Sequence, residues 1–232
     1  MIKAVFFDLY QTIVRYDPPR EETLAQIMDE FGIKVTADSL QHPFAVADEF
    51  IHVEHSRLGI SHRSEDEKIS LYTKYQTILL KEAGIEPTAE LVRNNIIKMQ
   101  KVTLRRILFD DVLPVLSSLK ENDYILGLIS NIDDDIKPLL DELGLMSFLS
   151  VVVTSRDSGY HKPNPEIFRY AAEQAAVKVE ESIYIGDQYQ VDVLGAKDAG
   201  MQAVLLDRNG FSADDIKEPI VKNLYQFVEQ LA

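Results

Sequence analysis

Cysteine is absent from this chain of 232 residues. Its absence excludes disulfide bonds, metal sites built from thiolates and a cysteine nucleophile, and it is compatible with the cytoplasmic location that we expect. Long apolar runs are absent as well, so no segment is expected to span a membrane. The apolar start of the chain is too short for a signal peptide and lacks a small-residue cleavage site.

Basic residues are few: 24 Lys and Arg face 38 Asp and Glu, and the formal net charge is −14. Such a surface argues against nucleic acids and anionic membranes as partners. A small anionic substrate is still compatible with it, because a local cation can invert the field around a site. The expected partner is therefore a small molecule, and no oligomeric state is predicted.

Strand signals are missing from the middle of the chain. After a loop expected at residues 15–20, apolar residues recur at helical spacing and are interrupted by breaks rich in glycine and proline. Helices are expected at residues 21–31, 37–57, 65–83 and 89–102. We therefore predict a helical insertion at residues 16–103.

The rest of the chain alternates short apolar strands with helices. Strands are expected at residues 2–7, 125–129, 149–153, 182–185 and 203–206, and helices at 112–121, 134–143, 165–175, 191–199 and 220–231. This alternation is typical of a parallel sheet with helices on both faces. We predict an α/β fold with a flavodoxin-like (Rossmannoid) core, formed by residues 1–15 and 104–232.

Polar residues follow the expected strands where these end. Asp8 follows the first strand, Ser130 and Asn131 follow the second, and Asp187 follows the fourth. Since ligands of open α/β sheets bind at the carboxyl ends of the strands, these residues are candidates for one site. Ser130 offers a hydroxyl group, and Asn131 is a residue type that can cap a following helix.

Two further residues complete the expected charge pattern. Lys162 lies in a loop with two prolines, and Asp192 follows Asp187 by five positions. If Asp8, Asp187 and Asp192 converge, their carboxylates cannot all stay ionised without a cation. Lys162 supplies one positive charge, and ligands made only of oxygen favour Mg²⁺ for the rest. A site of this composition suits phosphoryl groups.

Four segments resemble the signature motifs of the haloacid dehalogenase-like (HAD) hydrolase superfamily. They are Asp8-Leu9-Tyr10-Gln11-Thr12, Ser130-Asn131, Lys162-Pro163-Asn164-Pro165 and the segment from Gly186 to Asp192, in the order and spacing of that superfamily. The resemblance covers essentially the whole chain. It implies that the helical insertion is the helical cap of these enzymes.

The resemblance also implies roles for individual residues. Asp8 would be the nucleophile that carries a covalent aspartyl intermediate, Thr12 and Ser130 would hold the transferred group, and Lys162 would neutralise charge. Asn131 belongs to the same catalytic set.

The metal site implied by the resemblance contains four residues. Asp187 would bind Mg²⁺ directly, Asp192 would support the metal or its waters, and Asp8 and the backbone carbonyl of Tyr10 would be further ligands.

Tyr10 departs from the pattern of the family's phosphatases, which have a second aspartate there as general acid and base. A phenol with a pKa of about 10 is a poor base at neutral pH. L-2-haloacid dehalogenases of the family do carry tyrosine at this place. That branch is metal-free, however, and lacks the Gly-Asp-x-x-x-x-Asp pattern that this chain keeps at residues 186–192.

Other positions also depart from known branches. Gln11 stands where both branches usually have glycine, and Phe168 stands where the dehalogenases have tyrosine. Candidates for their substrate-binding arginine are Arg20, Arg57 and Arg63. His161 could line the site. Residues 133–135, all aspartates, are expected to form a solvated first helical turn, and one of them could substitute as the base.

We therefore predict a Mg²⁺-dependent phosphatase of a small phosphorylated metabolite, with an aspartyl-phosphate at Asp8 and acid–base catalysis weakened by Tyr10. Two alternatives stay open. One is an L-2-haloacid dehalogenase-like enzyme, and the other is a binding or regulatory module with negligible catalysis.

Overall fold

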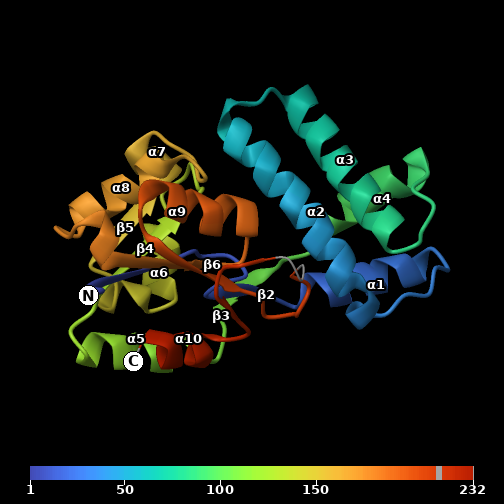
Figure 1. The fold of residues 1–232 in the computed structure, drawn as a ribbon. Helices are drawn as coiled ribbons and strands as arrows, with labels where there is room; N and C mark the ends of the chain where they lie inside the picture. Colours follow the sequence, from blue (N-terminus) through green and yellow to red (C-terminus); the bar gives the residue numbers. More distant parts are fainter. Residues whose placement is uncertain (213–215, 232) are drawn as a thin grey trace. The chain divides into compact units, whose positions relative to one another are not determined.

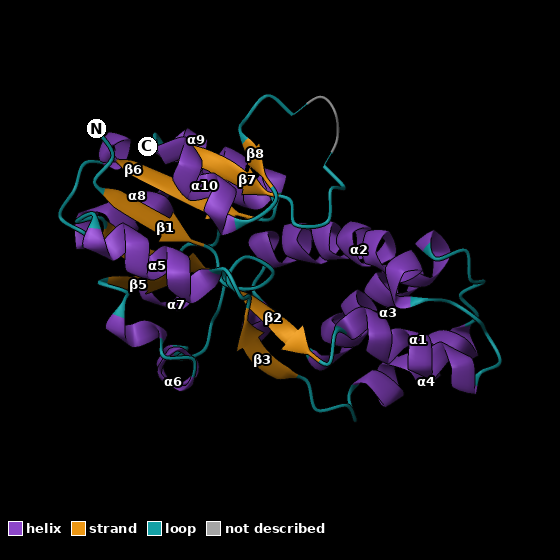
Figure 2. Ribbon diagram, turned by 90° about the horizontal axis from the view of Figure 1, so that it is seen from below, coloured by secondary structure: helices purple, strands orange, loops and turns teal. Residues whose placement is uncertain are grey.

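The computed structural model describes residues 1–212 and 216–231. The chain divides into two compact units, one comprising Met1–Arg15 with Leu108–Ala232 and the other comprising Tyr16–Ile107. The first unit holds a parallel sheet with flanking helices, and the second is mainly helical (Figures 1 and 2). No helix in the described part of the chain is both long and apolar enough to cross a membrane.

The α/β unit contains a six-stranded sheet in the order β5-β4-β1-β6-β7-β8. Its strands are β1 (Ala4–Phe7), β4 (Ile125–Ser130), β5 (Val151–Thr154), β6 (Ser182–Gly186), β7 (Gln202–Leu206) and β8 (Ile220–Val221). Every neighbouring pair is parallel. The predicted α/β fold is therefore confirmed.

The two faces of this sheet bury different side chains of β1. Val5 and Phe7 join one core, while Ala4 and Phe6 join another, as the alternation of side chains along a strand requires. Helices α5 (Val112–Glu121), α6 (Lys137–Glu142) and α10 (Leu224–Leu231) contribute to the first core. Helices α8 (Pro165–Gln174) and α9 (Leu194–Ala199) cover the opposite face (Figure 1).

Strand register brings the predicted site residues to one edge of the sheet. Phe7 at the end of β1 pairs with Leu128 of β4 on one side and with Ile185 of β6 on the other. Parallel strands that are paired in this register end at the same edge. The residues that follow these strands therefore emerge side by side.

The helical unit contains α1 (Arg20–Glu30), α2 (Ala37–Arg57), α3 (Glu65–Glu82) and α4 (Ala89–Met99), close to the four expected helices. Its core includes Leu24, Leu40, Phe44 and Leu79. Side chains of Thr36, Ser64 and Thr88 cap the starts of α2, α3 and α4 by accepting hydrogen bonds from backbone N–H groups. These caps satisfy donors that a helix start would otherwise leave without partners.

Three expectations about local structure were wrong. Residues 15–17, expected in a loop, belong to β2 (Val14–Asp17), which forms a two-stranded sheet with β3 (Arg105–Leu108). Residues 220–221 form the edge strand β8 rather than the start of the last helix. The helix expected at 134–143 begins only at Lys137. Both β2 and β3 are partly exposed and charged, so they lack the apolar pattern of a buried strand.

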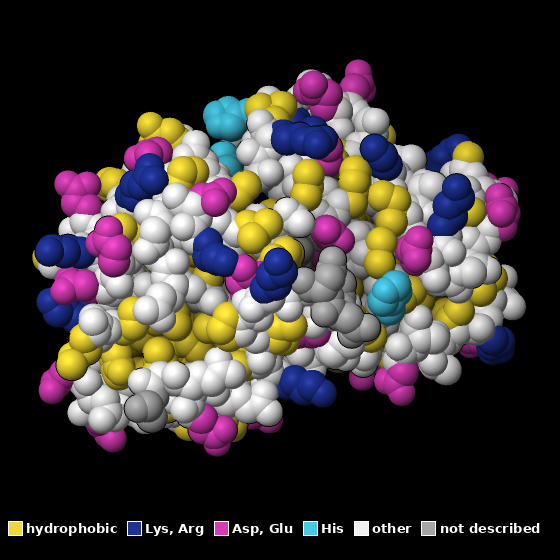
Figure 3. Space-filling model, viewed as in Figure 1, with side chains coloured by type: hydrophobic (Ala, Val, Ile, Leu, Met, Phe, Trp, Pro, Cys, Tyr) yellow, Lys and Arg dark blue, Asp and Glu magenta, His cyan; other side chains and the backbone are white. Residues whose placement is uncertain are grey.

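The surface of the α/β unit seen in Figure 3 shows basic and acidic side chains interspersed. Over the described residues on that face, Lys and Arg form no continuous band. A phosphate backbone would need such concentrated positive charge to bind strongly.

Candidate active site

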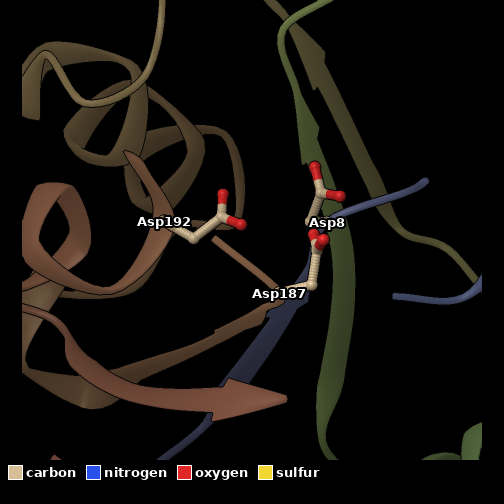
Figure 4. Close-up of side chains that lie close together, drawn as sticks. All are labelled: Asp8, Asp187 and Asp192. Atoms are coloured by element: carbon tan, nitrogen blue, oxygen red, sulfur yellow. The ribbon is translucent and has the colours of Figure 1, made fainter. Parts of the chain in front are cut away.

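Three carboxylates meet at the carboxyl edge of the sheet. Asp8 follows β1, Asp187 follows β6, and Asp192 lies in the turn of π-helix at Tyr189–Val193 that precedes α9. One oxygen atom of each residue lies within 4.8 Å of the others. Figure 4 shows the three side chains close together at this edge. The three aspartates therefore converge in the structure, as predicted.

Lys162 reaches the same point from the loop before α8. Its Nζ donates hydrogen bonds to Asp8 Oδ1 at 2.7 Å and to Asp192 Oδ1 at 2.6 Å. The residue is only 3% exposed, so both interactions are shielded from solvent. Lys162 therefore supplies the positive charge that the sequence pattern requires.

The charged groups of this cluster shift one another's pKa values. Burial raises the pKa of Asp8 and the charge of Asp192 adds to the increase, while Lys162 opposes it. Burial alone would lower the pKa of Lys162, but Asp192 and Asp8 outweigh it and the pKa is raised. Lys162 is thus held in its charged form. A cation beside Asp8 would favour the ionised carboxylate that a nucleophile requires.

Asn131 fixes the loop that carries Lys162. Its Oδ1 accepts a hydrogen bond from the backbone N of Lys162 at 2.7 Å, and its Nδ2 donates to the backbone O of the same residue at 2.9 Å. The expectation that Asn131 caps the following helix was wrong, since α6 has Ile136 at its start and no side-chain cap. The amide instead ties the end of β4 to the loop of the lysine.

The three aspartates differ in how many contacts the protein already makes with them. Asp192 is 1% exposed; its Oδ1 accepts from Lys162, and its Oδ2 accepts from the backbone N of Gln188 at 3.0 Å. Asp187 is less buried and accepts a hydrogen bond from the side chain of Gln188 at 2.8 Å. Oxygen ligands fit a hard divalent cation such as Mg²⁺. Asp8 and Asp187 are therefore the better candidates for direct ligands, with Asp192 in support.

The segment after Asp8 has two unusual features. Gln11 has a φ of 60°, in the left-handed region where glycine is favoured. Thr12 is fully buried, and among the described residues its Oγ1 has no hydrogen-bond partner. A buried hydroxyl without a partner is costly, and an anionic group bound beside it would accept the missing hydrogen bond. Ser130, also buried, lies at the end of β4.

Arg208 supports the Thr12 segment, a contact that sequence reasoning missed. Its guanidinium donates to the backbone O of Thr12 at 2.8 Å and makes two hydrogen bonds to Asp111, at 2.9 and 3.0 Å. It also lies 3.9 Å from the centre of the Phe109 ring. The only sequence signal was an arginine and an aspartate of opposite charge far apart in the chain.

Tyr184 of β6 was also missed, while Gly186 belongs to the predicted fourth motif. The hydroxyl of Tyr184 accepts a hydrogen bond from Lys162 Nζ at 2.8 Å. A Cβ atom at Gly186 would lie 2.4 Å from Asp192 Oδ2, so only glycine allows this carboxylate to approach the strand. A tyrosine within an aliphatic strand was the signal that could have identified the first residue.

Several other candidates have defined partners. Asp133, expected in a solvated helical turn, accepts a hydrogen bond from Ser155 at 3.0 Å and lies 3.6 Å from His161 Nε2. Tyr10 is half-buried and forms an isolated parallel bridge with Val14. Phe168 is buried, with its ring packed edge-on against Tyr184.

The three candidate arginines all lie in the helical unit and are engaged there. Arg20 makes two hydrogen bonds to Asp48, at 3.1 and 2.7 Å. Arg57 donates to the Glu54 side chain at 2.6 Å, and Arg63 donates to the Glu54 backbone O at 2.6 Å. Each guanidinium already has an oxygen acceptor within its own unit.

Comparison with known proteins gives a consistent result. Residues 2–200 match the family described as haloacid dehalogenase-like hydrolase. The chain is similar to the protein named glyceraldehyde 3-phosphate phosphatase of Methanothermobacter thermautotrophicus, with 31% identity over 89% of this chain and 86% of that one. Similarity to the protein of the same name from Methanopyrus kandleri is 29% over 91% of this chain and 86% of that one.

A solved structure resembles the fold over its full length. The HAD phosphatase from Thermococcus onnurineus aligns with 100% of this chain and 98% of its own, with a TM-score of 0.60 and 26% sequence identity.

Proposed function

Since the chain belongs to the haloacid dehalogenase-like hydrolase family, we propose that it is a Mg²⁺-dependent phosphatase of a small phosphorylated metabolite. The family match confirms the resemblance to this superfamily. The observation that carries the proposal is the cluster of Asp8, Asp187 and Asp192 around Lys162. Relatives named as phosphatases support the same choice.

The acidic cluster also separates this proposal from the dehalogenase alternative. Three close carboxylates and one ammonium leave net negative charge in a buried site, which is costly unless a cation binds. A dehalogenase without metal has no use for such a cluster. It also needs an arginine for the carboxylate of its substrate, whereas Arg20, Arg57 and Arg63 are engaged within the helical unit.

The proposed chemistry has two steps at Asp8. In the first, a carboxylate oxygen of Asp8 attacks the phosphorus of the substrate, and the bond from phosphorus to the leaving oxygen breaks. In the second, water attacks the phosphorus, the bond to Asp8 breaks, and inorganic phosphate leaves. One proton of that water ends on the leaving alcohol, so the overall reaction is hydrolysis.

Other residues hold the reacting groups. Lys162 keeps the Asp8 carboxylate in place through its hydrogen bond to Oδ1. The hydroxyls of Thr12 and Ser130 would donate to phosphoryl oxygens; within the described residues the buried Thr12 Oγ1 has no hydrogen-bond partner, which supports this role for Thr12. Mg²⁺, when bound by Asp8, Asp187 and the Tyr10 carbonyl with Asp192 in support, neutralises phosphoryl charge.

Tyr10 limits this chemistry in two places. A phenol is a poor base at neutral pH. It therefore cannot complete the acid–base cycle in which one group protonates the leaving alkoxide and then activates the attacking water. We propose slow turnover on ordinary phosphate esters and better turnover on acyl phosphates or aryl esters, whose leaving groups need no proton. Residues 16–103, as a cap, would shape the specificity pocket.

The decisive test is a panel of phosphate esters and 2-haloacids, assayed with and without EDTA. We expect phosphate release that EDTA abolishes, and none from the Asp8→Asn variant. Asp29→Asn, which changes an exposed aspartate of α1, is the matched control and should keep activity. Phosphate release that EDTA does not affect contradicts the metal-dependent mechanism. Halide release that EDTA does not affect favours the dehalogenase, and no turnover on any compound favours a binding module.

A further inference from the structure

Tyr184 lies in the interior of β6, three residues before Asp187, and is fully buried. We infer that Tyr184 is a positioning residue: its hydroxyl completes the set of acceptors that fixes the Lys162 ammonium group against Asp8. This inference rests on the proposed function for its kinetic consequence, while its structural part stands on the contacts alone.

The Lys162 ammonium has three N–H donors, and the protein supplies one acceptor for each. Nζ lies 2.7 Å from Asp8 Oδ1, 2.6 Å from Asp192 Oδ1 and 2.8 Å from the Tyr184 hydroxyl. All three donors are thus used within the protein. In this arrangement Lys162 acts on the substrate through Asp8, whose position and charge it controls.

The Tyr184 hydroxyl is itself held in one place. It accepts from Lys162, and its own proton can go to the backbone O of Ile129 or to Asp192 Oδ1, both at 3.1 Å. Ile129 belongs to β4 and Asp192 to the turn after β6. One hydroxyl therefore links the lysine to both sides of the site.

The ring of Tyr184 cannot easily swing away. It packs edge-on against Phe168 of α8, with ring centroids 5.1 Å apart and planes at 88°. Both residues belong to the core that α8 and α9 form on the sheet. The position of the hydroxyl is therefore set by the core rather than by a mobile side chain.

Loss of this hydroxyl would leave one N–H of a buried ammonium without an acceptor. The side chain of lysine has a flexible four-carbon stem, so Nζ would move toward the two carboxylates or toward solvent. A nucleophile misplaced by a small distance loses much of its rate. The expected consequence is a lower kcat with little change in KM, because Tyr184 is fully buried and acts on the substrate only through Lys162 and Asp8.

The test compares Tyr184→Phe with Tyr75→Phe. The control also removes a hydroxyl that bonds to a carboxylate, since the partly buried Tyr75 donates to Asp48 Oδ1 at 2.8 Å in the helical unit. Both variants should fold. We expect kcat for phosphate release to fall about 10- to 100-fold in Tyr184→Phe only, the range for one hydrogen bond to a charged group. A kcat equal to that of Tyr75→Phe overturns the inference.

A second readout does not depend on turnover. The protons of the Lys162 ammonium, followed by NMR with nitrogen-labelled lysine and assigned with a Lys162→Met variant, should exchange slowly with water in the wild type. They should exchange clearly faster in Tyr184→Phe but not in Tyr75→Phe. Equal exchange rates contradict the inference. If the wild type releases no phosphate while Tyr184→Phe still exchanges faster than Tyr75→Phe, only the proposed function is contradicted.

Discussion

At the residue scale, Tyr10 sets the rate that we expect from this site. It lies two positions after the proposed nucleophile, where it is half-buried beside Val14. General acid–base catalysis typically contributes about 10²–10⁴-fold to a rate. A site that forms the aspartyl intermediate but lacks this help should react slowly in both steps.

Tyr10→Asp should therefore raise kcat for ordinary phosphate esters, by up to about 10²-fold. The measurement is steady-state phosphate release in the presence of Mg²⁺. Tyr225→Asp, at a half-exposed position of α10, is the control and should leave kcat unchanged. An unchanged kcat in Tyr10→Asp would mean that another group already serves as the acid and base.

Gly186 is the second position where one side chain decides the outcome. In Gly186→Ala the new Cβ would lie 2.4 Å from Asp192 Oδ2 and would displace that carboxylate from Lys162. We expect loss of both phosphate release and thermal stability. Gly144 has a φ of 71° and no atom within 4 Å of an added Cβ, so Gly144→Ala should lose some stability through backbone strain alone and keep its activity. Full activity of Gly186→Ala would contradict the assigned packing.

At the scale of secondary structure, the sequence predicted those elements that are buried on both faces. β1 and β6 are buried along their whole length, and their only residues with polar side-chain groups are Ser182 and Tyr184. Such strands appear as short apolar runs. The edge strand β8 has two residues, and its pairing with β7 depends on a distant segment. No local pattern encodes that pairing.

The site divides in the same way. Asp8 and Asp187 were predictable because carboxylates directly after buried strands have few structural reasons to be there, and Lys162 and Asp192 were predictable from the charge pattern and spacing around them. Tyr184 was not, because within β6 a tyrosine is indistinguishable from an ordinary core residue until its hydroxyl is placed. The role of Asn131 was missed because its partner is the backbone of a loop 31 residues away.

The helical unit contains a buried ion pair that joins two of its helices. The two terminal nitrogens of the Arg20 guanidinium, on α1, donate to Asp48 of α2, and the Tyr75 hydroxyl of α3 donates to the same carboxylate. Burial alone would raise the pKa of Asp48, but Arg20 outweighs it and holds the pKa below its ordinary 3.8. The pair is therefore fully charged at neutral pH.

Asp48→Asn should lower the free energy of unfolding by about 3–5 kcal/mol, because it leaves the Arg20 charge buried without a counter-charge. Because the pKa of Asp48 is lower in the folded than in the unfolded state, this ion pair stabilises the folded protein fully at pH values above the unfolded-state pKa. That stabilisation is lost as the pH falls through the folded-state pKa. The difference from wild type should thus be full at pH 7 and shrink below 3.8. Chemical denaturation at several pH values measures it. A constant difference would contradict the ion-pair assignment, and the exposed control Asp29→Asn should change little.

At the scale of the whole molecule, the chain forms two compact units with separate cores. The carboxylates of the proposed metal site all belong to the α/β unit, and the polypeptide passes between the units twice, near residues 15–16 and 107–108. The assignment of residues 16–103 as a specificity cap stays a prediction.

Mg²⁺ should stabilise the molecule through the α/β unit. A ligand at about a hundredfold excess over its Kd adds about 2.7 kcal/mol to the stability of the state that binds it. Calorimetry of the wild type should show a rise in the Tm of the α/β unit on addition of Mg²⁺, and Asp187→Asn should lose most of that rise. An equal rise in Asp187→Asn would mean that the ion binds elsewhere.

The central claim is that Asp8 carries a phosphoryl group during turnover and that Tyr10 slows its removal. Peptide mass spectrometry after acid quenching of the working enzyme tests this most directly. The account predicts a phosphoryl group on Asp8 in the wild type with Mg²⁺, a smaller amount in Tyr10→Asp, and none when EDTA is present. A wild-type enzyme that releases phosphate while Asp8 stays unmodified, or while another residue is modified, would contradict the account.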